Sequence, residues 1–280
     1  MEEKYMAKKT TNLSDRMKRY EFVSRDYLTL KTPVIIRCDG RAFHSFARGL
    51  KKPFDAILMK SMQDTALALS EAVQGCILAY TQSDEISLVL IDYQTKDTAA
   101  WFDYNVQKCA SIAASMATKY FNKFFTKYAN EWIENYHDAW NTSKEDDKYY
   151  GTLLKLIDIG AEFDARVFNL PKEEVANYIY WRQDDASRNS IQMVGHAYFS
   201  NNQMHKKSNS EIQDMLMLQH NINWNNFPIP QKRGTCCVRR DKEIIGKDGV
   251  PIIRKKWVID KEIPIFTGEN RAYIEDLINI

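Results

Sequence analysis

The sequence predicts an α+β fold in which helices flank a mainly antiparallel sheet. The predicted elements follow the order strand, helix, hairpin, helix, strand, helix, without the regular alternation expected of a doubly wound parallel sheet. The 280 residues are 44% hydrophobic and 12% aromatic, which suffices for one large core or two small ones. The chain has only 10 glycines and 7 prolines, which excludes collagen-like and low-complexity architectures.

The first elements are a helix, a strand and a second helix. Residues 12–23 have apolar side chains at helical spacing. Residues 33–38 form a β-branched apolar run that stops at the turn signal Asp39-Gly40, which leaves a carboxylate at the strand end. Apolar residues recur with a period near 3.6 over residues 54–73, so a helix should pack on that strand.

A hairpin and a long helix follow. The strand-like runs 76–80 and 86–91 are separated by the polar residues 81–85, which predicts antiparallel pairing and a polar tip. Residues 97–126 have a helical pattern with small alanines that would let the helix lie close to a sheet. The polar stretch 138–152 is expected to be a loop.

The second half begins with another strand–helix step. Residues 163–169 predict a strand, Pro171 ends it, and a helix is expected from there to about Ser200. A further short helix is predicted over residues 210–219. No internal repeat of solenoid length is visible.

A basic hairpin is predicted near the C-terminus. The strand-like runs 235–238 and 250–253 flank the turn signal Asp248-Gly249. Residues 232–256 contain nine Lys or Arg and three acidic residues, whereas the whole chain has a net charge of only +2. Two interpretations stay open, namely contact with phosphates and a charged edge that prevents aggregation of the sheet.

Composition also bears on location and on cysteine chemistry. No stretch approaches the roughly 18 apolar residues of a membrane span, and charges occupy the N-terminal region where a signal peptide is apolar. We therefore expect a cytoplasmic protein without a membrane partner. Five cysteines without a CxxC pair argue against a disulfide scaffold or a structural zinc site.

The candidate chemistry lies in two acidic groups. Asp39 ends a buried strand, and Asp84-Glu85 sits on the tip of a hairpin expected beside that strand. Magnesium is held by one or two protein carboxylates together with water and phosphate oxygens, and two such ions activate an attacking hydroxyl and stabilise a leaving group. The alternative is that these residues occur only because turns favour aspartate.

The surroundings favour a nucleotide. The run after Asp39 supplies a permissive glycine, an arginine, backbone amides and aromatic rings for base stacking, while His44 and Lys52 are either phosphate contacts or surface residues. In the predicted helix after Pro171, polar residues recur on one face. Solvent exposure explains that face, but its amides and arginines also fit a nucleic-acid surface. Its members are Arg182, Asp185, Asn189, Gln192 and His196.

The sequence resembles the tRNA-histidine guanylyltransferase family and, within it, the bacterial and archaeal 3′-to-5′ tRNA polymerases. An ordered set of motifs over roughly residues 12–240 supports the resemblance. The motifs are IIRCDGRAFHSF (35–46), KKPFD (51–55), AYTQSDEIS (79–87), FDARVFNLP (163–171), WRQDDASRNSIQ (181–192), INWN (222–225) and QKRGT (231–235).

The resemblance implies a polymerase-palm-like fold and a set of site residues. Asp39, the Gly40 carbonyl and Asp84 would hold two Mg²⁺ ions, with Glu85 as a third catalytic residue. The implied nucleotide-binding residues are Asp39, Gly40, Arg41, Ala42, Phe43, His44, Lys52, Ser83, Asp84, Lys108 and Asn189. The implied tRNA-binding residues are Arg182, Gln183, Arg188, Lys232 and Arg233.

The resemblance further implies a reaction and an assembly. ATP or GTP would activate the 5′ end of a tRNA, and the 3′-hydroxyl of an incoming nucleotide would then displace pyrophosphate, in an enzyme that assembles as a homotetramer. Two alternatives are a catalytically inactive RNA-binding palm protein and a palm-fold nucleotidyl cyclase. We expect residues 1–240 to form the catalytic domain with a helical tRNA-facing part, and residues 241–280 to be a basic hairpin and tail packed on it.

Three positions depart from the pattern of eukaryotic family members. Ser187 stands where those proteins have a histidine after the WRQ motif, Ala42 replaces a polar residue, and Asn105 stands where arginine is frequent. These differences favour the relatives that rebuild truncated tRNA 5′ ends by base pairing, while guanylate addition to histidine tRNA stays a second expected activity.

Overall fold

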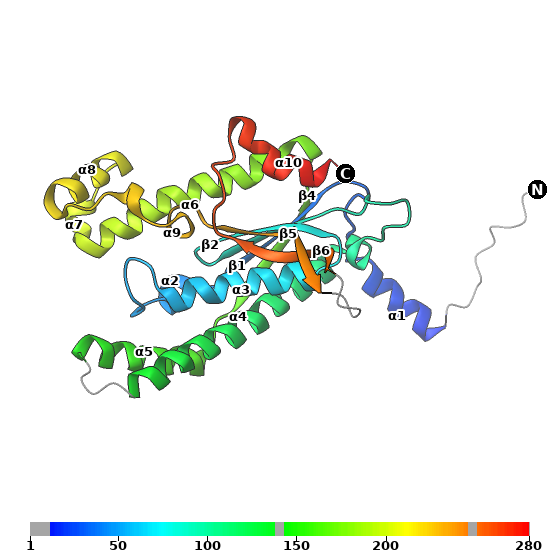
Figure 1. Ribbon diagram of the computed structural model, residues 1–280. Coiled ribbons are helices and arrows are strands. Elements are labelled where there is room, and N and C mark those ends of the chain that lie inside the picture. Colours follow the sequence, from blue (N-terminus) through cyan, green and yellow to red (C-terminus); the bar gives the residue numbers. More distant parts are fainter. Residues whose placement is uncertain (1–11, 138–142, 246–250, 280) are drawn as a thin grey trace, which may run out of the picture.

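The computed structural model describes residues 12–137, 143–245 and 251–279 and has helices on both faces of one antiparallel sheet (Figure 1). The strand order is β4-β1-β3-β2-β5-β6, and every neighbouring pair is antiparallel. The strands are β1 (Val34–Gly40), β2 (Cys76–Gln82), β3 (Glu85–Leu90), β4 (Phe163–Asn169), β5 (Thr235–Ile245) and β6 (Pro251–Asp260). The predicted fold class is confirmed.

The described helices fall into two layers and a few peripheral segments. The α-helices are α1 (Leu13–Phe22), α2 (Phe43–Phe46), α3 (Ala56–Ala72), α4 (Val106–His137), α5 (Lys144–Ile159), α6 (Val175–Tyr198), α7 (Asn201–Met204), α8 (Asn209–His220), α9 (Ile229–Arg233) and α10 (Ala272–Ile278). Short 3-10 turns are η1 (Trp101–Tyr104), η2 (Lys172–Glu174), η3 (Trp224–Asn226) and η4 (Gly268–Arg271). Within these described elements, no helix is both long enough and apolar enough to cross a membrane.

Each face of the sheet has its own core because side chains alternate along the strands. Val34, Ile36 and Cys38 of β1 point toward α3 and α4 and join the larger core. Ile35 points to the other face and joins a second core with α6 and α10. This alternation assigns Asp39 and its cross-strand neighbours to the α6 side of the sheet.

The C-terminal tail contributes to the second core. Ile263, Phe266, Ile274 and Ile278 are at most 1% exposed and pack in that core. The boundary expected at residue 240 falls inside β5, and β5 joins β2 over the four pairs from Leu78–Val238 to Thr81–Thr235.

Two element predictions were wrong in part. The long helix expected over residues 97–126 begins only at Val106, because Phe102 and Asp103 adopt left-handed backbone angles that break a helix. The loop expected over residues 138–152 overlaps α5, whose N-cap Ser143 accepts a hydrogen bond from the Asp146 amide at 3.1 Å. The acidic run reflects the preference of helix N-termini for negative charge. Residues 138–142 of the expected loop and the Asp248-Gly249 turn lie outside the described residues.

Candidate active site

The predicted meeting of two aspartates occurs where β1 ends. Asp39 and Gly40 are the last residues of β1, and the hairpin tip between β2 and β3 is the two-residue turn Ser83–Asp84. Asp39 pairs with Glu85 in the ladder, and the Gly40 amide donates a hydrogen bond to the Asp84 carbonyl at 3.1 Å. Residues 45 positions apart in the sequence are therefore neighbours at one end of the sheet.

The electrostatics of this end are unfavourable without a cation. Burial raises the pKa of Asp84, and the charges of Asp39 and Glu85 raise it further, against the lowering effect of hydrogen bonds from Ser83 and the backbone. Across the described part of the chain, neither Asp39 nor Asp84 forms an ion pair. A bound cation would relieve this repulsion.

The donor set fits magnesium. In the described ranges, no three His, Cys, Asp or Glu side chains converge in a manner that would hold a metal. Two carboxylates and the Gly40 carbonyl leave the remaining coordination positions to water and phosphate oxygens, which is how Mg²⁺ is usually bound. Closed all-protein sites such as structural zinc centres need more ligands than these residues offer.

Glu85 differs from the two aspartates because it already has a cationic partner. Its oxygens accept hydrogen bonds from Nε and Nη2 of Arg182 at 2.7 and 2.6 Å, and both residues are buried. Burial alone lowers the pKa of Arg182, but the bonds to Glu85 and the charge of Asp185 raise it overall. Glu85 is thus a neutralised carboxylate that holds α6 against the hairpin tip.

Two residues predicted to bind tRNA are instead part of the interior. Arg182 is 7% exposed and is paired with Glu85. Gln183 is 2% exposed, and its amide donates to the Pro264 carbonyl at 2.8 Å and accepts from the Phe266 amide at 3.0 Å. The prediction for these two side chains is corrected, because their partners lie on segments that only the fold brings near α6.

The segment after Gly40 keeps part of its predicted role. Phe43 is 5% exposed in a cluster of aromatic rings, so its ring cannot stack on a base. Gly40 is required here because a Cβ at this position would lie 2.1 Å from that ring. Ala42 adopts a left-handed conformation with φ of 52°, which turns the chain so that Arg41 and His44 stay exposed. Arg41 pairs with Glu162.

The two predicted phosphate-binding lysines lie in different places. Lys52 is exposed two residues before Phe54, near the start of α3. Lys108 is on α4, ten residues before Thr118, whose hydroxyl accepts a hydrogen bond from the Phe163 amide opposite Gly40. Ten helical residues span about 15 Å, so Lys108 lies far from the aspartates and its assignment to the nucleotide site is corrected.

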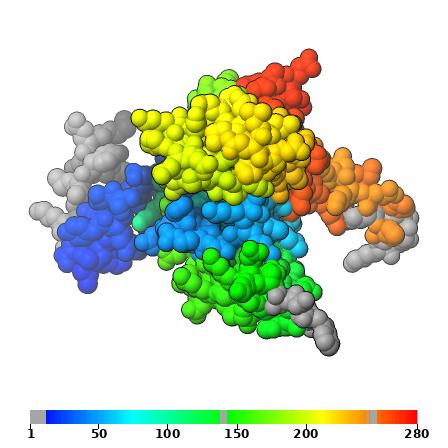
Figure 2. All heavy atoms as spheres, turned by 90° about the vertical axis from the view of Figure 1, so that its left-hand side faces the viewer, coloured from blue at the N-terminus to red at the C-terminus, as the bar shows by residue number. Residues whose placement is uncertain are grey.

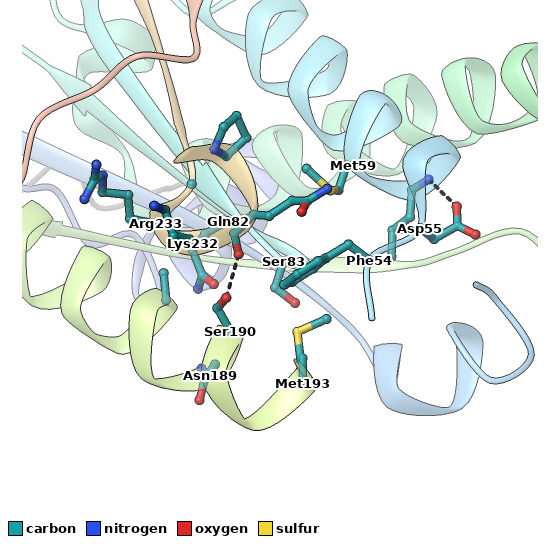
Figure 3. A pocket seen from close by; sticks show the side chains of 15 residues that line it. Phe54, Asp55, Met59, Gln82, Ser83, Asn189, Ser190, Met193, Lys232 and Arg233 are labelled. Atoms are coloured by element: carbon teal, nitrogen blue, oxygen red, sulfur yellow. Dashed lines mark hydrogen bonds between the residues drawn. The ribbon is translucent and has the colours of Figure 1, made fainter. Parts of the chain in front are cut away.

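A cleft of about 530 Å³, open solvent included, lies beside the hairpin tip (Figure 3). Four elements form it: the segment entering α3, the β2–β3 tip, α6 and α9. The structure brings together the predicted residues Ser83, Asn189, Lys232 and Arg233 in its lining. Figure 2 views the molecule from this end, where residues near 50 lie between α6–α8 and α4–α5.

The sequence analysis missed the apolar and amide residues of this cleft. They are Phe54, Met59, Gln82, Met193 and Gln231. Phe54 and Met193 fit the helical periodicity of core residues, so the sequence pattern assigns them to the interior. Only the folded structure shows that Met193 is 40% exposed. An apolar wall beside amides and cations is typical of a small-molecule site.

The cationic side of the cleft consists of Lys232 and Arg233. Burial and the adjacent charge of Arg233 lower the pKa of Lys232, whose Nζ lies 5.7 Å from the centre of the Trp224 ring. The buried Nε of Arg233 has no hydrogen-bond partner in the described structure. Gly234 is needed beside them, because its φ is +82° and a Cβ would lie 2.5 Å from the Thr81 carbonyl.

Arg188 is the remaining residue of the predicted tRNA surface. It is exposed on α6 and pairs with Asp184 at 3.3 Å and Asp185 at 3.8 Å. The hydroxyl of Ser187, one residue earlier, donates to the Gln183 carbonyl at 3.0 Å within the same helix. This side of α6 therefore combines an exposed arginine with a serine that is bonded internally.

Comparison with known proteins identifies the family of this chain. A sequence model of the family described as tRNAHis guanylyltransferase matches residues 14–171. A solved bacterial tRNA(His) guanylyltransferase (Thg1)-like protein in complex with ATP aligns with a TM-score of 0.77 and 38% identity, covering 96% of this chain and all of that one. A probable tRNA(His) guanylyltransferase of Drosophila melanogaster is 26% identical over 246 residues, 82% of this chain and 76% of that protein. This chain therefore belongs to the tRNA(His) guanylyltransferase family.

Proposed function

We propose that this protein is a nucleotidyltransferase that extends the 5′ end of tRNA in the 3′-to-5′ direction and releases pyrophosphate. The observation that supports this best is the convergence of Asp39 and Asp84, without a protein cation, beside an open cleft that contains Lys232 and Arg233. Two solved structures titled as a bacterial tRNA(His) guanylyltransferase (Thg1)-like protein, one in complex with ATP and one with GTP, align at 38% and 36% identity. The same nucleotides are the proposed activating and substrate nucleotides here.

Asp39, Asp84 and the Gly40 carbonyl are the residues that would hold two Mg²⁺ ions. When bound, the metal supplies activation of the attacking 3′-hydroxyl and stabilisation of the leaving pyrophosphate. At a 5′-triphosphorylated end, a P–O bond forms between that hydroxyl oxygen and the 5′ phosphorus, the hydroxyl proton passes to water, and the bond to pyrophosphate breaks. At an end activated by ATP, pyrophosphate has already left in the activation step, and the bond that breaks in the transfer releases AMP. Glu85 and Arg182 act as positioning residues, because their buried pair fixes the hairpin tip that presents Asp84.

The cleft is proposed to receive a nucleoside triphosphate. Phe54 and Met193 supply apolar surface for a base, and the Asn189 amide supplies hydrogen bonds. Lys232 and Arg233 supply positive charge for phosphate oxygens. Arg41, His44 and Lys52 are exposed on the segment between Gly40 and α3 and extend the same role.

We further propose that template-dependent repair is the main activity. The Ser187 hydroxyl bonds within α6 and provides no imidazole for recognition of histidine tRNA. A homotetramer is also proposed. It is supported by α1, which buries none of its residues and exposes the apolar side chain of Leu13 and the ring of Tyr20, at 63% and 71%. Such surface is available for contact with another copy of the chain. Residues 241–280 are proposed to belong to the same folding unit, because their tail packs in the second core.

The test incubates the protein with Mg²⁺, all four nucleoside triphosphates and two RNAs. One RNA is a tRNA with a 5′-truncated acceptor stem, and the other is a histidine tRNA without its extra guanylate. Base-paired extension of the truncated tRNA supports repair, whereas addition confined to histidine tRNA overturns the repair assignment. Binding without pyrophosphate release would indicate an inactive RNA-binding protein, and small cyclic products made without RNA would indicate a cyclase.

A further inference from the structure

Helix α9 contains both cations of the cleft, yet it is too short to fix its own orientation. It has only five residues, from Ile229 to Arg233, and none of them is buried. Its N-cap Pro228 makes no side-chain cap hydrogen bond. A helix of one to two turns is marginal in water without outside contacts. The direction in which Lys232 and Arg233 point therefore depends on what holds this segment.

No carboxylate holds the two cations in place. Across the described residues, neither Lys232 nor Arg233 forms an ion pair. The Lys232 ammonium donates to the Asn225 carbonyl, which lies on the same stretch of chain, and the buried Nε of Arg233 has no hydrogen-bond partner. The backbone of α9 therefore sets where the two charges lie.

One hydrogen bond to that backbone comes from the sheet. Tyr80 of β2 is fully buried, and its ring packs in the second core beside Phe266. Its hydroxyl donates to the Arg233 carbonyl at 2.8 Å. Burial raises the pKa of Tyr80, so the hydroxyl stays protonated and able to donate. Gly234 permits this close approach, because a Cβ there would lie 2.8 Å from the Tyr80 hydroxyl oxygen.

A second hydrogen bond comes from α6. Ser190 is buried, and its Oγ donates to the Gln231 carbonyl at 2.7 Å (Figure 3). The same oxygen accepts a hydrogen bond from Nε1 of Trp224 at 2.9 Å. A serine hydroxyl has a single proton to donate, and here that proton goes to α9. Two layers of the fold, the sheet and α6, thus hold the backbone of α9 at alternate residues.

We propose that Tyr80 and Ser190 are positioning residues of the nucleotide cleft, whose two hydrogen bonds aim the cations of α9 at the phosphates of the bound nucleotide. This inference rests on the proposed function, because that function places a nucleoside triphosphate in the cleft. Tyr80 lies on the strand that leads into the Ser83–Asp84 turn. One strand therefore carries the carboxylate at its end and, through the Tyr80 hydroxyl, fixes the cations. A triphosphate that contacts both meets charges held at a set separation.

The experiment removes one hydroxyl at a time and compares each loss with a matched control. Tyr80→Phe deletes the bond to α9 and keeps the ring. Its control is Tyr93→Phe, because the Tyr93 hydroxyl also donates to a backbone carbonyl, that of Ile278 at 3.3 Å, in a contact outside the cleft. Ser190→Ala deletes the second bond, and Ser190→Thr keeps a hydroxyl there. Equilibrium binding of ATP and of adenosine is measured with Mg²⁺ and without tRNA, and the unfolding temperature shows that each variant folds.

Tyr80→Phe and Ser190→Ala should each weaken ATP binding by about three- to tenfold, the effect of one lost hydrogen bond. Adenosine binding should stay unchanged, because the lost bonds act on phosphate contacts alone. Tyr93→Phe and Ser190→Thr should bind ATP as the wild type does. In a protein that already contains Lys232→Ala and Arg233→Ala, Tyr80→Phe should have no further effect, since its bond acts through those charges.

An equal loss of ATP and adenosine affinity would give the two hydroxyls a purely structural role and overturn the proposal. The same follows if Tyr80→Phe binds ATP as tightly as Tyr93→Phe. If Tyr80→Phe does not fold, the two Ser190 variants decide alone. The proposed function fails in a different way, when the wild type adds no nucleotide to tRNA or binds no ATP, and absence of ATP binding by the wild type would overturn this proposal as well.

Discussion

Carboxylates lie at both ends of the antiparallel β1–β3 pair, but their surroundings differ. The near end is where β1 stops at Gly40, and the far end is where β3 stops at Leu90. At the far end, Asp92 is 1% exposed and accepts two hydrogen bonds from the Lys31 amide, at 2.9 and 3.0 Å, with the Lys31 ammonium 4.0 Å away. At the near end, Asp39 and Asp84 repel each other and burial raises the pKa of Asp84. The difference separates a carboxylate that is satisfied within the fold from two carboxylates that we propose to hold a cation.

Glu85 and Asp84 show the same contrast between two adjacent residues. It neighbours Asp84 in the sequence, yet its charge is matched by Arg182 through two hydrogen bonds. Removing one partner of a buried ion pair leaves an uncompensated charge, so this pair belongs with Asp92 on the structural side of the comparison.

The largest expected effect is on catalysis at the near end. Asp39→Asn and Asp84→Asn should each lower the rate of nucleotide addition by about 10³-fold or more, because each removes a metal-holding charge while keeping the side-chain volume. The measurement is a single-turnover assay on a 5′-triphosphorylated, truncated tRNA. Unchanged tRNA affinity and an unfolding temperature no lower than that of the wild type are the controls, and full activity of both variants would contradict the site.

The next effect is on stability at the far end. Asp92→Ala should lower the free energy of unfolding by about 1–3 kcal/mol, because it removes a buried carboxylate that accepts from the Lys31 amide and leaves that amide without this acceptor. Denaturant unfolding measures this loss. The addition rate of the folded protein should stay unchanged, and a large drop in rate without a loss of stability would mean that both ends serve catalysis.

The smallest effect has the opposite sign. Asp84→Asn should raise the free energy of unfolding by less than about 1 kcal/mol at neutral pH, because it removes a charge that the fold disfavours. The folded-state pKa of Asp84 lies above its unfolded value, so the native protein binds more protons between the two values and the wild type loses stability as pH rises through them.

The stabilisation by Asp84→Asn should therefore shrink as pH falls through the raised pKa of Asp84 and vanish below the unfolded value. Unfolding curves at neutral and mildly acidic pH measure this dependence. Mg²⁺ should raise the stability of the wild type and remove the advantage of the variant. A stabilisation that is equal at all pH values would show that the charge of Asp84 is not its cause.

Much of the fold could be predicted from short stretches of sequence, and the wrong element predictions have physical reasons. The β-branched run before Asp39 and the polar hairpin tip were sufficient to predict β1, β2 and β3. The strands β5 and β6 are much longer than the predicted four-residue runs, because their charged ends lack an apolar pattern and are stabilised by pairing with each other. The acidic start of α5 was mistaken for a loop, since the same residues favour turns and helix N-termini.

The sequence alone determined where the acidic residues stand along the strands and which family motifs surround them, because strand ends and turns depend on neighbouring residues. It did not determine which carboxylates are free. Glu85 and Arg182 are 97 residues apart in the sequence and 2.6 Å apart in space, and Phe54, Asn189 and Lys232 meet only around the cleft. Coulomb energy and burial depend on distances in space, so the assignment of Asp39 and Asp84 as the unpaired acids required the folded chain.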